Sequence, residues 1–279
     1  FNVIDTPGYP ELIGQTLSSL RAADNAVIVI DAHGGIKVNT RRIWNEAGRQ
    51  GLGRFICITK VDDHSADIGQ LMQSINDVFG PQCVLFNVPV GSGADVKGVA
   101  STIAGKNVDG AVLDIGPLSE KAIETIIEVD DAVMEKYFEG EIPSSDVLMR
   151  LAAQGVVKGT IVPVVCVSAK LGVGLGEWID LVAALGTPPS SIERTAAKNG
   201  DTVTLKADPQ APLAAQVFRT RSDPYVQRLS YIRVYAGTLE KDSLIPSPAE
   251  RKGIKIGGLF KVQGEKTTPV DSASAGDIV

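Results

Sequence analysis

Short runs of consecutive apolar residues, set between amphipathic stretches, recur through the first two thirds of the chain. The runs Ala26–Ile30, Phe55–Ile58 and Val162–Val167 are apolar on both faces, which is typical of parallel strands covered by helices on each side. Helical periodicity marks the stretches around them, at Leu12–Ala22, Asn39–Gln50, Ala66–Phe79 and Trp178–Leu185. Because strands and helices alternate, we expect an α/β fold with a doubly wound, mostly parallel sheet.

Polar residues follow these strands directly. Asp31, Thr59 and Ser168 come after the three runs, and Asp5 comes after the apolar segment Phe1–Ile4, which we expect to be a further strand. In doubly wound sheets, ligands bind outside the carboxyl ends of the strands. The four positions therefore predict where a binding site is assembled.

A long segment interrupts this rhythm. The gap between Phe55–Ile58 and Val162 is too long for a single crossover helix, so we expect an inserted subdomain at about 90–158. Within it, Val108–Ile115 indicates a strand pair, Ser119–Glu139 a long helix with Ser119 as N-cap, and Asp146–Val156 a second helix.

The pattern changes near the C-terminal end of the α/β region. We expect that domain to span 1–189, a polar linker to span 190–207, and a second domain to span 208–279. After Pro212, short strands alternate with Asp-Pro, Ala-Gly and Gly-Glu turns, at Leu213–Phe218, Leu229–Tyr235, Ser243–Ile245 and Gly257–Val262. Frequent short strands indicate an antiparallel β-barrel, which we expect to be truncated in this chain.

The tetrapeptide Asp5-Thr6-Pro7-Gly8 has parts that suit recognition of a nucleotide triphosphate. An aspartate at a strand end can serve a phosphate-bound magnesium ion, the proline stiffens the turn, and the glycine lets a backbone N–H approach the last phosphate. A plain surface turn after a strand explains the same four residues. Taken alone, the tetrapeptide leaves both interpretations open.

Two further motifs follow in order along the chain. Thr59-Lys60-Val61-Asp62 ends a buried strand; Asp62 can accept two hydrogen bonds from the N1–H and amino group of guanine, and Lys60 can lay its methylenes along the base. Ser168-Ala169-Lys170 ends the next sheet strand, where backbone N–H groups can hold the guanine carbonyl oxygen. Each alone is equally compatible with an ordinary turn, but their common order and placement favour a guanine site.

Composition narrows the alternatives. A net charge of −6 argues against a wholly basic nucleic-acid binder, and we expect neither DNA nor a membrane as a partner, since no apolar run approaches the length of a span. The three cysteines, Cys57, Cys83 and Cys166, lack metal-like spacing. An odd number of cysteines without a secretory signal predicts a cytoplasmic protein.

Together these motifs resemble the translational GTPases, and most closely the elongation factor G family. Further resemblances are Arg21-Ala22-Ala23-Asp24, Asp31-Ala32 with Trp44, the insertion, and the barrel segments Ser222–Val226, Arg233–Tyr235, Gly237–Leu239 and Ala275–Ile278. The barrel match is the most specific part.

The resemblance implies roles for these motifs. Asp5 would hold Mg²⁺ through water, Thr6, Pro7 and Gly8 would form the turn at the γ-phosphate, and the two later motifs would bind the base of GTP or GDP. It also implies a monomer that binds the ribosome and couples GTP hydrolysis to translocation.

The chain departs from the family pattern at three places. The phosphate loop G-x-x-x-x-G-K-[ST] is absent, since Gly105-Lys106 is followed by Asn107; we therefore expect a fragment that, alone, binds GTP poorly and is inactive.

Tyr9 stands where the family has a catalytic histidine, and a phenol cannot play an imidazolium role; it either positions water or merely packs over the turn. Thr59 replaces the usual asparagine, a mild change.

Two alternatives remain open at this level. One is a translational GTPase of the ribosome-protection or release and recycling type. The other is a ribosome-binding module that does not hydrolyse GTP, which Tyr9 keeps possible.

Overall fold

The computed structural model describes residues 1–198, 200–223, 227–247 and 250–279. The chain divides into two compact units. Residues 25–187 form one, which we call the α/β unit, and residues 1–24 together with 188–279 form the other, which we call the β unit. In the part of the chain that is described, we find no helix long and apolar enough to cross a membrane.

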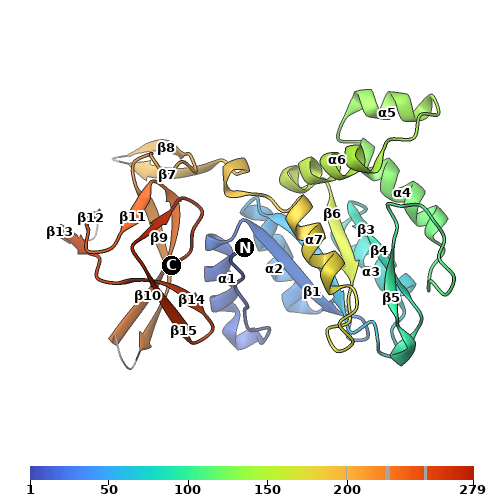
Figure 1. Ribbon diagram of the computed structural model, residues 1–279, viewed down its shortest axis with the longest axis horizontal. Coiled ribbons are helices and arrows are strands. Elements are labelled where there is room, and N and C mark those ends of the chain that lie inside the picture. The colour runs from blue at the N-terminus through green and yellow to red at the C-terminus, as the bar shows by residue number, and fades with distance from the viewer. Residues whose placement is uncertain (199, 224–226, 248–249) are drawn as a thin grey trace. The chain divides into compact units, whose positions relative to one another are not determined.

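A parallel four-stranded sheet is the centre of the α/β unit (Figure 1). Its strand order is β1-β2-β6-β3, and each neighbouring pair is parallel. The strands are β1 (Asn25–Asp31), β2 (Gly53–Thr59), β6 (Val162–Cys166) and β3 (Cys83–Leu85). The expected parallel α/β sheet is thereby confirmed, with Asp31 and Thr59 closing their strands and Ser168 just beyond β6.

Alternate residues of the central strands enter two separate cores. Ile56 and Ile58 of β2 belong to one core, which the helices α2 (Val38–Arg49) and α3 (Ile68–Phe79) complete. Phe55 and Cys57 point into the other, which holds residues of α4 (Ile115–Ile127), α6 (Ser145–Lys158) and α7 (Leu175–Leu185). Helices therefore pack on both faces of the sheet, as its apolar strands require.

The edge strand β1 departs from this rule. Ala26, Ile28 and Ile30 are buried, but Val27 is 42% and Val29 is 62% exposed. The expectation that Ala26–Ile30 is covered on both faces is wrong for these two valines. The sequence run could not distinguish an edge strand from a central one, because both are apolar at every position.

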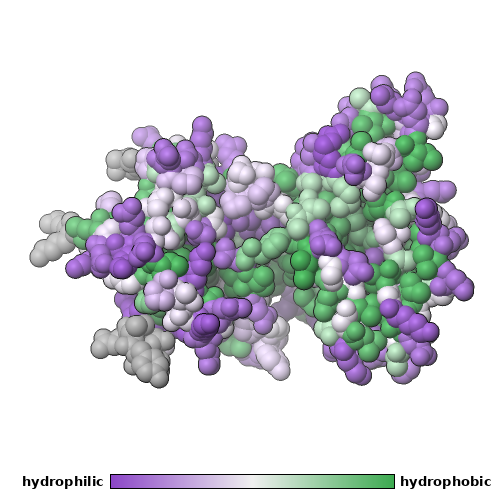
Figure 2. Space-filling view, viewed as in Figure 1, coloured by the Kyte–Doolittle hydropathy of each residue, from purple (hydrophilic) through white to green (hydrophobic). Residues whose placement is uncertain are grey.

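The insertion differs in detail from its prediction. Val108–Ile115 forms no strand pair; Ala111 makes one isolated bridge to Val90, and α4 begins at Ile115 with Asp114 as its N-cap. The expected helix Ser119–Glu139 is two helices, because Asp130 accepts bonds from two backbone N–H groups and starts α5 (Asp131–Phe138). The helix at Asp146–Val156 is confirmed as α6. Hydrophilic residues cover the outer end of α5 (Figure 2).

A short hairpin, β4 (Asn87–Val90) with β5 (Gly98–Ser101), connects the insertion to the sheet. Asn87, which is buried, replaces a missing strand neighbour. Its side chain accepts from the Cys166 N–H at 2.7 Å and donates to the Cys166 carbonyl at 3.3 Å. The side-chain amide thus satisfies buried backbone groups of β6 next to the carboxyl end of that strand.

Antiparallel hairpins make up most of the β unit, with a small buried core at Val234, Leu239, Ile256, Leu259, Ala273 and Val279. The pairs are β7 (Arg194–Lys198) with β8 (Asp201–Leu205), β9 (Ala214–Asp223) with β10 (Gln227–Ala236), β11 (Thr238–Glu240) with β16 (Ser272–Ser274), β12 (Leu244–Ser247) with β13 (Glu250–Lys255), and β14 (Leu259–Gln263) with β15 (Lys266–Val270). The four expected strands correspond to β9, β10, β12 and β14. Pro224, Tyr225 and Val226 of the barrel motif lie outside the described residues.

Two segments of the β unit behave differently from expectation. Residues 1–8 form neither helix nor strand, so the predicted strand Phe1–Ile4 is wrong; Phe1 and Val3 are 87% and 89% exposed and pair with no strand among the described residues. The segment 190–207, expected as a linker, carries the hairpin β7–β8. After residue 8 comes a 3-10 turn at Pro10–Leu12 and then α1 (Ile13–Ala22), which confirms the expected helix.

Candidate functional site

A pocket of about 550 Å³ opens at the carboxyl ends of β2 and β6. It is lined by the segment after each of these two strands and by one turn of the insertion. The lining residues are Thr59, Lys60, Asp62, Asp63, His64, Ala94, Ala169, Lys170 and Leu171. Two motifs that lie far apart in the sequence therefore meet at one cavity.

Asp62 and Ser168 connect the two motifs directly. The Ser168 hydroxyl lies 2.5 Å from Asp62 Oδ1, and the same hydroxyl oxygen accepts from the Leu171 N–H at 3.1 Å. Because one donor already points at this oxygen, its own hydrogen is directed to the carboxylate. Ser168 is fully buried, so the Asp62 carboxylate is held in one orientation at the pocket wall.

The backbone N–H groups after β6 are not equivalent. The Ser168 N–H donates to the Val173 carbonyl at 2.9 Å, and the Val173 N–H returns a bond of 3.0 Å. The Ser168 N–H is therefore already bonded within the loop. It is one of the three N–H groups that the sequence suggested for a base carbonyl. The N–H groups of Ala169 and Lys170 are the ones that a ligand could use.

Lys60 adopts the left-handed backbone conformation, with φ of 59°, which is costly for a residue with a side chain. An ion pair accompanies this conformation: Lys60 Nζ lies 2.5 Å from Asp31 Oδ2. Asp31 also accepts from the backbone N–H groups of His33 and Gly34. The Lys60 stem is thereby fixed along the pocket wall.

These bonds perturb the titration of both groups. The hydrogen bond from Lys60, followed by that from the Gly34 N–H, lowers the pKa of Asp31 to about 2, and the bond to Asp31 raises the pKa of Lys60. A lowered carboxyl pKa stabilises the fold above the ordinary value near 3.8, and this contribution is lost as pH falls toward 2. The pair is therefore intact at neutral pH.

The insertion supplies the remaining wall of the pocket. Gly93 is buried with φ of 55°, and a Cβ at this position would overlap the ring of His64. Only glycine lets the His64 ring pack this closely against the turn that carries Ala94. Beside it, the Ser65 hydroxyl contacts Asp63 Oδ1 and lies 2.7 Å from His33 Nδ1, which ties the loops after β1 and β2 together.

The first motif belongs to the β unit. The Thr16 hydroxyl donates to the Pro7 carbonyl at 3.3 Å, and the Leu12 N–H donates to the Tyr9 carbonyl at 3.0 Å. A Cβ on Gly8 would meet no atom within 4 Å, and the Tyr9 side chain is 73% exposed. The turn is thus attached to α1 but open on its outer side. The roles expected for Asp5, Thr6, Pro7, Gly8 and Tyr9 stay predictions.

Sequence reasoning missed several residues that line the pocket or contact its lining. Asp31 was noted only as a strand end, and its contact with Lys60 depends on a left-handed backbone that the sequence does not reveal. His64 and Ala94 meet only because the insertion folds back onto the loop after β2. Asp63 and Leu171 adjoin the motifs, so their proximity could have been inferred.

The site can recognise a planar ligand with adjacent donors. An oriented carboxylate accepts two parallel hydrogen bonds, the aliphatic stem of Lys60 offers an apolar face, and two backbone N–H groups can meet an acceptor. Guanine presents N1–H and an amino group on one edge and a carbonyl oxygen beside them, whereas adenine has an acceptor at N1.

Comparison with known proteins shows the family of both parts of the chain. The family model of the elongation factor Tu GTP-binding domain matches residues 1–188, and that of elongation factor G domain 2 matches residues 212–279. Among solved structures, the chain resembles the crystal structure of ttk003000868 from Thermus thermophilus, with 26% sequence identity and a TM-score of 0.80. That match covers 98% of this chain and 41% of the other. The chain therefore belongs to the translational GTPases, as an elongation factor Tu-type GTP-binding domain followed by an elongation factor G domain 2.

Proposed function

We propose that this chain is the nucleotide-binding part of an elongation factor G-like GTPase that binds GTP and GDP and couples hydrolysis to translocation on the ribosome. The observation that carries the proposal is the buried Ser168 hydroxyl that orients Asp62 at the pocket. Family membership supports guanine nucleotides as the ligand class. The match to elongation factor G domain 2 favours the ribosome as partner.

The pocket residues suit the base of the nucleotide. Asp62 would accept the N1–H and amino hydrogens of guanine, and Lys60 would cover the ring face. The N–H groups of Ala169 and Lys170 would meet the carbonyl oxygen, because the Ser168 N–H is already used. Thr59 lines the same pocket and would take part in binding the base.

The turn Asp5–Gly8 suits the phosphate end. The carboxylate of Asp5 is an exposed oxygen donor of the kind that Mg²⁺ prefers, and the open space at Gly8 leaves room for close approach of a phosphate. Bound Mg²⁺ would neutralise charge on the phosphates during hydrolysis.

Among the residues of this turn, Tyr9 is the one to which we assign a catalytic role. Its phenol is exposed, which favours positioning of a water over packing on the turn. A phenol can donate one hydrogen bond but cannot serve as an imidazolium. We propose that it orients the attacking water without exchanging a proton with it.

The test of base recognition is Asp62→Asn in the protein at its full natural length. An amide can donate to a carbonyl, so the variant should lose GTP and gain xanthosine triphosphate, whose carbonyl replaces the guanine amino group. Loss of two hydrogen bonds to a charged acceptor corresponds to about 3 kcal/mol or more, or at least about 100-fold in Kd. Equilibrium binding of both nucleotides to the wild type and the variant measures the switch.

Asp77→Asn is the matched control, since Asp77 is an exposed carboxylate on α3. It should bind GTP as the wild type does. If the Asp62→Asn protein kept its GTP affinity and did not bind the xanthine nucleotide, Asp62 would not recognise the base. Guanine as the ligand of this pocket would then be contradicted as well.

A further inference from the structure

The C-terminal end of α1 is held by side chains from the strands of the β unit. A helix leaves its last carbonyl groups without backbone partners, and here three successive carbonyls each accept one side-chain donor. The bonds are Tyr235 OH to Arg21 O at 2.6 Å, Arg233 Nη1 to Ala22 O at 3.2 Å, and Arg194 Nη2 to Ala23 O at 2.8 Å.

Asp24, the next residue, joins the same cluster. Its carboxylate binds Arg233 Nη2 through both oxygens, at 3.1 and 2.8 Å, and Arg194 Nη2 at 3.0 Å. The side chains are 12%, 4% and 21% exposed for Asp24, Arg233 and Arg194. Such buried charges are tolerated only when they are paired, so removal of one member leaves its partners strongly destabilised. We call Asp24, Arg194, Arg233 and Tyr235 the helix clamp.

The clamp stands on well-anchored strands. Arg233 lies on β10 and forms an isolated bridge with Ile278, and backbone bonds join Ile232 to Val279 in both directions. The Arg194 and Arg233 guanidinium carbons lie 5.0 and 5.8 Å from the centre of the Tyr235 ring. Burial raises the pKa of Tyr235, so its hydroxyl remains a donor to the helix.

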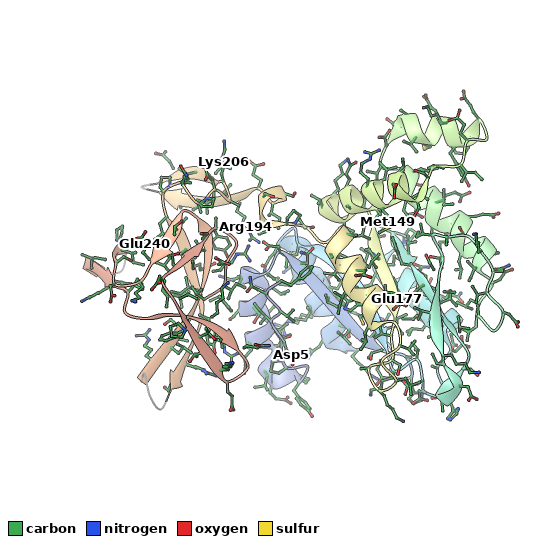
Figure 3. All side chains as sticks on the ribbon, in the orientation of Figure 1. Asp5, Met149, Glu177, Arg194, Lys206 and Glu240 are labelled. Carbon is green, nitrogen blue, oxygen red and sulfur yellow. The ribbon has the colours of Figure 1, made fainter. Side chains whose placement is uncertain are left out.

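The other end of α1 carries the turn that the proposed function assigns to phosphate. Thr16 of α1 bonds the Pro7 carbonyl, and Leu12, just before the helix, bonds the Tyr9 carbonyl. Figure 3 shows Asp5 toward the start of α1 and Arg194 at its far end. A continuous chain of hydrogen bonds within the β unit therefore leads from the Pro7–Tyr9 turn through α1 to β7 and β10.

We infer that the helix clamp fixes α1 and thereby the position of the Pro7–Tyr9 turn, the segment that the proposed function assigns to the phosphate end of the nucleotide. The inference rests on the proposed function and adds four positioning residues to it, none of which lies in the pocket at β2 and β6. When its last turn is fixed, α1 keeps one orientation, and the segment before its first turn keeps one position. Loss of the clamp would spread the positions of Gly8 and Tyr9 while leaving the base pocket untouched.

Two variants test the clamp in the protein at its full natural length. Tyr235→Phe removes one hydroxyl and keeps the ring, and Arg233→Lys keeps the charge but cannot reach both the carbonyl and the carboxylate. For both variants, kcat for GTP hydrolysis should fall, by up to about 100-fold for the arginine change. GDP affinity should stay at the wild-type value, because GDP lacks the phosphate that the turn contacts. Hydrogen exchange of the Ile13–Ala22 amides should become faster.

Arg219→Lys is the control, because it makes the same chemical change on β9 in a residue whose described contact is with Tyr231. It should match the wild type in all three measurements. If Tyr235→Phe also matched the wild type in kcat and in exchange, the inference would be overturned, whether or not Arg233→Lys folds. A parallel loss of GDP affinity and kcat would likewise overturn it in favour of a general structural role. A wild-type protein that bound no guanine nucleotide would overturn the proposed function, and the inference with it.

Discussion

The hydroxyl of Ser168 determines the direction in which the site can recognise a ligand. It accepts from the Leu171 N–H and donates to Asp62, so the serine acts as a connector between the loops after β2 and β6. Without it, the carboxylate could rotate, and each encounter with a base would cost the entropy of fixing it again. The serine is therefore a positioning residue for Asp62.

Ser168→Ala should weaken guanine nucleotide binding roughly tenfold, or about 1.4 kcal/mol, through loss of one charge-assisted hydrogen bond. It should not create affinity for xanthine nucleotides, because Asp62 still carries its carboxylate. Titration calorimetry with GDP measures the change. Ser74→Ala, on a half-buried serine that bonds within α3, should bind GDP normally. Equal affinities for the two variants would show that Asp62 needs no support from Ser168.

Residue-level prediction succeeded where strand ends determined position. Lys60, Asp62 and Ser168 follow buried strands that pair in parallel, so their proximity follows from the sheet. The Lys60–Asp31 ion pair could not be predicted, because it depends on a positive φ at a residue that has no preference for it. The approach of His64 to Gly93 depends on how a long insertion closes.

Among the elements, the hairpin β4–β5 shows how the insertion is joined to the sheet. Asn87 takes the place of a strand neighbour by bonding both polar groups of Cys166. Its buried side chain holds the end of β6 two residues before Ser168. The stability of this connection therefore bears on the geometry of the pocket.

Asn87→Ala should lower the free energy of unfolding by about 2–4 kcal/mol, since two buried backbone groups lose their partner. In a domain of this size that corresponds to a melting temperature lower by roughly 5–15 °C. Asn45→Ala, at an exposed position on α2, should change stability by less than about 0.5 kcal/mol. Thermal unfolding of the three proteins makes the comparison. If Asn87→Ala melted at the wild-type temperature, water or a shifted strand would supply the hydrogen bonds that the Cys166 backbone loses. Asn87 would then not be needed to hold β6.

Long helices and strands with buried partners were predicted correctly, whereas a short segment without a partner was not. Long amphipathic helices such as α2 and α3 and the buried strands β2 and β6 were found from periodicity alone. The strand expected at Phe1–Ile4 has the right composition but pairs with no described neighbour in the β unit, and composition cannot report a partner. The division of one expected helix at Asp130 was signalled by a capping aspartate, although the apolar pattern continues across it.

The whole chain combines two compact units that carry different parts of the proposed reaction. The α/β unit holds the pocket at β2 and β6, which we propose for the base. Its first and last residues are joined, because Asn25 exchanges two hydrogen bonds with Thr187. The β unit holds α1, the helix clamp and the Pro7–Tyr9 turn, which we propose to meet the phosphates. Its strands were predictable from turn residues. The segments Arg21–Asp24 and Arg233–Tyr235 were also visible in the sequence, but their contacts, more than 200 positions apart, were not.

The proposed function depends on guanine binding at the ends of β2 and β6. The most direct measurement is a crystal structure of the protein at its full natural length with GDP and Mg²⁺. We predict that the Asp62 carboxylate accepts hydrogen bonds of about 2.7–3.2 Å from guanine N1 and the amino group, with Ser168 still bonded to it and Lys60 over the ring. A base bound elsewhere, or one that met Asp62 through neither nitrogen, would contradict the account.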